Sequence, residues 1–154
     1  MDNVSKSVIS EELIFLDENF KNQDEVIDFI VENAEKIGYV TDKKSLYAAV
    51  KKREQEVPTA IGYSIAIPHG KTEAVEHPFI AFVRTANEIK WTEQGEELVR
   101  LIFLIGVPEK SEGKLHLKFI SQLSKKLLDD EFRAELLSKE NKNGIFEQLS
   151  SIEI

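Results

Sequence analysis

Helical spacing of apolar residues is the first pattern along this chain. In residues 24–38 the apolar side chains fall three, four and one positions apart, which predicts a helix with one buried face that ends at Gly38. A second helix is expected after Thr41 or Asp42, because both residue types are good N-caps. This helix should end before Pro58.

The middle of the chain has the pattern of strands. Residues 64–68, 79–85 and 98–108 are apolar runs, and the last two are almost continuously apolar, as in strands that are buried on both faces. Further helices are predicted after them, over 114–130, 130–137 and 143–152. Because helices precede, separate and follow the strands, we predict an α/β fold, a three-layer α/β/α sandwich with a central mixed β-sheet.

Composition agrees with one folded domain. The chain has 154 residues, 42% of them apolar and 31% charged, and we expect a single domain over residues 1–154. It has no cysteine, which excludes disulfides, thiolate metal sites and a cysteine nucleophile. The first residues have no signal-peptide pattern and no window is apolar enough to span a bilayer, so we expect a soluble, cytoplasmic protein. A net charge of −8 makes nucleic acid an unfavourable partner.

His69 is the first candidate for chemistry. Strand alternation in 64–68 would carry its ring onto the side of Ile67. Pro68 lacks an N–H and is expected to end the strand pairing there, and Gly70 leaves the backbone open to close approach by a second molecule or an anion. A histidine held in this way suits a nucleophile that is reached from outside. The alternative is an ordinary histidine in a turn at a strand end.

Two further residues could assist such a nucleophile. His116 shares a helix face with core residues near a helix N-terminus, where an anion such as a phosphoryl group binds well, although it could be a core histidine bonded to a backbone carbonyl. Arg53 lies near the end of the second helix, where it could bind phosphoryl oxygens or be a solvated residue of the helix C-terminus. His77 is expected to be exposed in a loop.

No established cofactor motif accompanies these residues. The sequence has no glycine-rich phosphate loop, no pair of histidines at metal-binding helical spacing and no serine in a nucleophile elbow. We therefore expect neither a cofactor nor a metal.

One longer motif contains His69. It consists of Glu54, six residues, an apolar residue, a glycine, two residues and the sequence IAIPHG. With residues 89–109 and 116–137, it resembles the enzyme IIA domain of the fructose/mannitol class of the bacterial phosphoenolpyruvate-dependent sugar phosphotransferase system, and the fructose-like branch in particular. The resemblance extends from about Glu11 to Leu149.

This resemblance implies a phosphocarrier, a phosphotransferase component with a phosphohistidine intermediate. His69 would accept a phosphoryl group on Nε2 from the phosphohistidine of the carrier HPr and pass it to a cysteine of enzyme IIB, which acts with membrane enzyme IIC. Arg53 and His116 match the arginine and second histidine that flank this site in the family. The resemblance also implies an apolar docking patch around His69, and the acidic excess of the chain suggests an acidic rim that attracts the donor.

Two alternatives to sugar transport follow from the same residues. One is a regulatory IIA similar to the nitrogen-type branch, in which phosphorylation of His69 controls the binding of partner proteins. The other is a structural module without a phosphorylated site, which the full motif disfavours.

Overall fold

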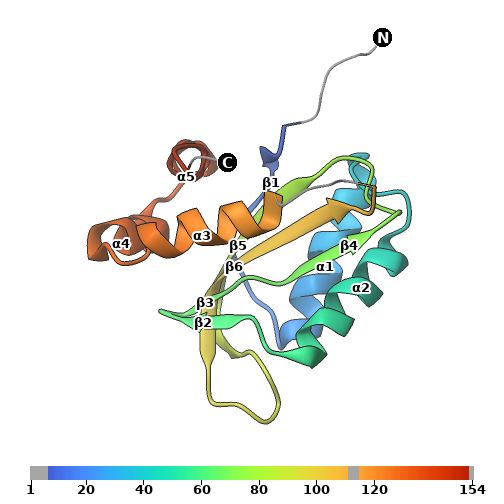
Figure 1. The fold of residues 1–154 in the computed structure, drawn as a ribbon. Helices are drawn as coiled ribbons and strands as arrows, with labels where there is room; N and C mark the ends of the chain where they lie inside the picture. The colour runs from blue at the N-terminus through green and yellow to red at the C-terminus, as the bar shows by residue number, and fades with distance from the viewer. Residues whose placement is uncertain (1–6, 111–114, 153–154) are drawn as a thin grey trace.

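The molecule is a six-stranded sheet with helices on both faces (Figure 1). The computed structural model describes residues 7–110 and 115–152, with side chains from residue 117 onward in the second range. The strands are β1 (Ile9–Glu18), β2 (Ala60–Gly62), β3 (Ile65–Ala66), β4 (His69–Thr72), β5 (Phe79–Lys90) and β6 (Leu98–Pro108). The helices are α1 (Gln23–Lys36), α2 (Lys43–Glu56), α3 (Leu115–Lys126), α4 (Asp130–Ser138) and α5 (Lys142–Ser150).

The sheet is mixed, as predicted. Its strand order is β1-β5-β6-β3-β2, and β4 pairs with β6 beyond the end of β3. β1 runs parallel to β5, β5 is antiparallel to β6, and both β3 and β4 run parallel to β6. Helices α1 and α2 cover one face and α3, α4 and α5 lie on the other (Figure 1), and each face has its own apolar cluster. The three-layer α/β/α sandwich is therefore confirmed.

Each of the two N-terminal helices begins after a side-chain cap, and for α2 this cap is Asp42, one of the two residues predicted. The side chain of Asn22 accepts a hydrogen bond from the Glu25 amide at 3.0 Å, and that of Asp42 accepts one from the Lys44 amide at 3.1 Å. Helix α2 then ends at Glu56, before Pro58. None of the helices that the structure describes has the length and hydropathy needed to cross a membrane.

Three strands were not predicted from the pattern. β1 was not predicted, because its apolar residues do not alternate regularly. Its pairing with β5 also contains register shifts. β2 and β4 have only three and four residues, and β4 has the sequence HGKT, which carries little strand preference. The structure therefore corrects the place of His69, which is the first residue of a strand and not part of a loop.

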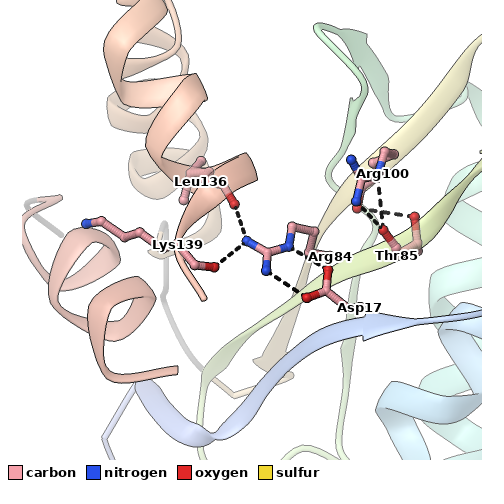
Figure 2. Close-up of polar contacts among 6 residues, drawn as sticks. All are labelled: Asp17, Arg84, Thr85, Arg100, Leu136 and Lys139. Atoms are coloured by element: carbon pink, nitrogen blue, oxygen red, sulfur yellow. Dashed lines mark hydrogen bonds and ion pairs between the residues drawn. The ribbon is translucent and has the colours of Figure 1, made fainter. Parts of the chain in front are cut away.

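Arg84 joins three parts of the fold on the α4 side of the sheet (Figure 2). Its side chain is 3% exposed, and its Nε and Nη2 each donate to a carboxylate oxygen of Asp17 at 2.9 Å. Its Nη1 donates to the carbonyl oxygens of Leu136 at 3.0 Å and Lys139 at 2.7 Å, at the C-terminal end of α4. One buried guanidinium thus connects β1 and β5 to a helix end whose carbonyls lack intrahelical partners.

We expect Arg84→Met to lower the free energy of unfolding by about 3 kcal/mol, because it leaves the Asp17 carboxylate and two helix-end carbonyls without their donor. Lys90→Met, at an exposed position of the same strand, is the matched control and should change it little. Urea unfolding of the variants measures the difference. Equal stability of Arg84→Met and Lys90→Met would contradict this role.

The same ion pair should make stability depend on pH. The hydrogen bonds from Arg84 lower the pKa of Asp17 below its ordinary value. A carboxylate with a lowered folded-state pKa stabilises the fold above its unfolded pKa, and this contribution disappears as pH falls through the folded value. The stability difference between the wild type and Asp17→Asn should therefore be constant near neutral pH and shrink in acid. A difference that grows in acid would be inconsistent with the pair.

Candidate functional site

The register of β3 and β4 against β6 sets the direction of His69. Ile65 lies opposite Leu101 and His69 lies opposite Ile105, so both strands keep one register along β6. Ile65, Ile67 and Ile105 belong to the apolar cluster on the α3 side, which confirms the predicted alternation. His69 lies on this side too.

Pro68 does not end the strand pairing, contrary to the expectation from the sequence. Its carbonyl oxygen accepts a hydrogen bond from the Ile105 amide at 3.0 Å, and pairing continues through β4. A proline lacks only the donor of a residue, so its acceptor can still join a strand ladder. β3 and β4 therefore pair with β6 in one register on the two sides of Pro68.

The imidazole of His69 is oriented by its own strand. Its Nδ1 lies 3.0 Å from the carbonyl oxygen of Ile67. A carbonyl can only accept, so in the neutral ring Nδ1 carries the proton and donates it to this bond. Nε2 is then the unprotonated nitrogen of the ring.

The surroundings of the half-buried His69 favour the neutral ring. Burial lowers the pKa of His69 below its ordinary value, and the positive charge of Arg53 lowers it further. The hydrogen bond to Ile67 and the negative charge of Glu54 act in the opposite direction, but the balance is a lowered pKa. The ring is therefore unprotonated at neutral pH, as a nucleophile must be.

A hollow of about 340 Å³ lies beside His69, between α2 and β4. Its lining residues are Ala49, Lys52, Arg53, Glu56, His69, Gly70 and Lys71. Three of these side chains are cationic and one is a carboxylate, although the whole chain has a net charge of −8. The acidic rim expected around His69 is thus not found among the residues that line the hollow, which instead suits an anion.

Arg53 lies near the C-terminal end of α2, where the sequence placed it. Its Nη1 donates to the carbonyl oxygen of Val57 at 2.8 Å, beyond the C-terminal end of α2. The same side chain lines the hollow beside His69. Because a guanidinium has five N–H donors, this one bond leaves others for an anion.

Gly70 has a structural role that the sequence did not show. It is buried, and an added Cβ would lie 2.9 Å from Cγ2 of Val50, 3.0 Å from the Val50 backbone nitrogen and 3.2 Å from Cβ of Ala49. Because Gly70 has no side chain, α2 can pack closely against β4. The sequence led us to expect that Gly70 leaves room for an incoming molecule. In the structure it leaves room for helix α2.

The other two histidines are His116, expected in the site, and His77, expected in an exposed loop. His116 is a residue of α3, but its side chain lies outside the described part of the structure. His77 is half-buried instead of exposed, and its ring meets that of Tyr39 edge-on with 6.1 Å between centroids. It is not among the residues that line the hollow.

Glu54 anchors the end of α2 from the side opposite the hollow. Its buried carboxylate accepts hydrogen bonds from the Thr59 amide at 3.1 Å and from Nε1 of Trp91 at 3.0 Å, and also from the Thr59 hydroxyl. Glu54 thus fixes the chain that follows α2, next to Arg53. The acidic position of the sequence motif has this structural explanation.

Sequence reasoning missed Lys52, Glu56 and Lys71, which line the hollow. Lys71 could have been found, because strand alternation places it two residues beyond His69 on the same side. Lys52 and Glu56 gave no signal, since a charged residue on a helix is by default a solvated one.

We expect Gly70→Ala to destabilise the protein by about 2 kcal/mol and to displace β4, because the added methyl group meets the backbone of α2. Gly62→Ala is a useful comparison, since a Cβ there has open space and the cost arises from a φ of +93°. Thermal unfolding measures both, and the ring resonances of His69 report the displacement. A shift of these resonances in Gly62→Ala alone would contradict the proposed packing.

We expect the pKa of His69 to rise in Arg53→Ala, because the variant removes a positive charge that disfavours protonation of the ring. Lys44→Ala, an exposed lysine at the other end of the same helix, should leave this pKa unchanged. An NMR titration of the imidazole measures both values. Identical titrations of Arg53→Ala and the wild type would show that Arg53 does not act on the ring.

The chain is similar in sequence and fold to known proteins. A protein of Haloferax volcanii named "PTS system fructose-specific EIIA component" is 35% identical over 141 residues, which are 92% of this chain and 91% of that protein. Multiphosphoryl transfer protein 1 of Escherichia coli is 31% identical over 95% of this chain, which spans only 17% of that longer protein.

Solved structures agree with this relationship. The complex of enzyme IIA and phosphorylated enzyme IIB for mannitol from Escherichia coli has a chain that matches with a TM-score of 0.76 and 27% identity, over 92% of this chain and 96% of that one. The nitrogen regulatory protein IIA-Ntr of Neisseria meningitidis matches with a TM-score of 0.82 over 92% of this chain and 96% of that one, but at 24% identity it shows the shared fold alone.

The sequence model of one family covers nearly the whole described chain. It is described as "Phosphoenolpyruvate-dependent sugar phosphotransferase system, EIIA 2" and matches residues 7–152. Together with the fold and the relative that matches over 91% of its length, this match shows that the chain belongs to the EIIA 2 family of the phosphoenolpyruvate-dependent sugar phosphotransferase system.

Proposed function

We propose that this phosphotransferase component carries its phosphoryl group on Nε2 of His69, taken from the phosphohistidine of HPr and passed to a cysteine of enzyme IIB. The hydrogen bond between Nδ1 and the Ile67 carbonyl carries the proposal, because it leaves Nε2 as the nucleophilic nitrogen. The lowered pKa of His69 and the cationic hollow beside it support the same assignment. We also propose that residues 1–154 form one EIIA domain. It would act in the cytoplasm, where phosphoenolpyruvate is made.

The transfer follows from the bonds around the ring. Nε2 attacks the phosphorus of the donor as the donor's N–P bond breaks, and the donor imidazole departs with that electron pair. The His69 ring then holds a proton on Nδ1 and phosphorus on Nε2 and so gains positive charge, which the Ile67 carbonyl stabilises. When a cysteine thiolate of enzyme IIB attacks, the N–P bond breaks and the ring returns to its neutral form.

The neighbouring cation stabilises the negative charge in this reaction. Phosphoryl transfer depends mainly on alignment of the reacting atoms and on charge stabilisation. We assign the second role to Arg53, which lines the hollow. We also keep His116, at the start of α3, as a proposed residue of the site.

Membership of a sugar system is favoured over the regulatory alternative. The relative that matches over 91% of its length is named for fructose, and the structure of the mannitol complex supports enzyme IIB as the acceptor. We therefore propose a fructose-type system, with membrane enzyme IIC reached through enzyme IIB. The nitrogen regulatory protein supports only the fold.

We expect labelled phosphate from phosphoenolpyruvate, enzyme I and HPr to enter the wild type and His77→Ala but not His69→Ala. The label should be lost in acid and retained in base, because it is bound to nitrogen. Arg53→Ala should accept the label at least tenfold more slowly, with little change in stability, because the half-buried side chain bonds to a backbone carbonyl just past the helix end. Full labelling of a folded His69→Ala variant would overturn the assignment.

A further inference from the structure

A second cation shares the strand of the proposed phosphohistidine. Lys71 lies two residues after His69 in β4. His69 pairs with Ile105 of β6, and Lys71 pairs with Val107. Both partners belong to the apolar cluster on the α3 side, whereas Gly70 packs against α2. His69 and Lys71 therefore project from the same side of the strand, and both line the hollow.

The spacing lets a lysine reach the group that His69 would carry. Positions two residues apart on a strand are separated by about 6.6 Å. The flexible four-carbon stem of a lysine covers a similar distance. Lys71 is exposed, so its ammonium can move to a new anion without the loss of a buried contact.

On these grounds, and given the proposed function of His69, we propose that Lys71 is a further catalytic residue whose ammonium contacts the phosphoryl oxygens on His69. Arg53 approaches the hollow from α2 and Lys71 from β4, so the two cations bind the phosphoryl group from different elements. Arg53 is held by its bond to Val57, while Lys71 provides a mobile charge that can follow the group between donor, His69 and acceptor.

The local charges make this contact favourable. Besides Lys71, the charged side chains that line the hollow are Lys52, Arg53 and Glu56, all from α2. The carboxylate of Glu56 repels a phosphoryl group. It therefore offsets part of the positive charge that Lys52 and Arg53 supply from the same helix. Lys52, Arg53 and Glu56 together give a net charge of +1, and Lys71 from a second element raises it to +2, in a chain whose net charge is −8.

The experiment compares Lys71→Met, Lys71→Arg and the control Lys125→Met, an exposed lysine of α3 that does not line the hollow. Each protein is phosphorylated with phosphoenolpyruvate, enzyme I and HPr, and the phosphoryl group is titrated by phosphorus NMR. Loss of a contacting cation raises the pKa of the phosphoryl group, so the midpoint in Lys71→Met should move up by about 1. Lys71→Arg and Lys125→Met should keep the wild-type midpoint.

The rate of transfer gives a second measurement. Lys71→Met should accept the phosphoryl group from HPr about tenfold more slowly than Lys125→Met, and Lys71→Arg should recover most of the rate. A phosphohistidine signal whose midpoint is the same in Lys71→Met and Lys125→Met would overturn the role of Lys71, even if the rate fell. Absence of phosphorylation in the wild type would instead overturn the proposed function of His69.

Discussion

The unbroken register of β3 and β4 along β6 is the constraint on which the site depends. It carries the chain through Pro68 without a shift, so that His69 arrives opposite Ile105 on the α3 side of the sheet. The segment between β3 and β4 supplies the Ile67 carbonyl that accepts from Nδ1. A slip of one residue would turn the imidazole to the α2 side, where only a glycine fits against the helix.

Helix α2 completes the site by its closeness to β4. The contact with Gly70 brings the last turn of α2 beside His69, and Glu54 fixes that turn through Thr59 and Trp91. Buried hydrogen bonds on one side of the helix thus hold the cationic side that lines the hollow. This arrangement concentrates positive charge locally in an acidic chain, and it lets burial and Arg53 together keep the imidazole neutral.

Much of this could be predicted from the sequence, because helix caps and long apolar runs are local signals. Asp42 marked the start of α2 correctly, and alternation placed Ile67 and the following histidine on one side. The register that pairs β4 with β6 depends on residues more than 30 positions away, so neither the strand at His69 nor the packing of Gly70 could be read locally. The hollow was missed for the same reason, since α2 and β4 come together only in the folded chain.

The most direct test of the account is the identity of the nitrogen that carries phosphorus. NMR of the phosphorylated, nitrogen-15-labelled protein can separate the two ring nitrogens of His69 by their coupling to phosphorus. We expect phosphorus on Nε2 of His69, with Nδ1 still protonated and bonded to the Ile67 carbonyl. Phosphorus on Nδ1 would contradict it, because that bond would have to break and the ring would have to turn.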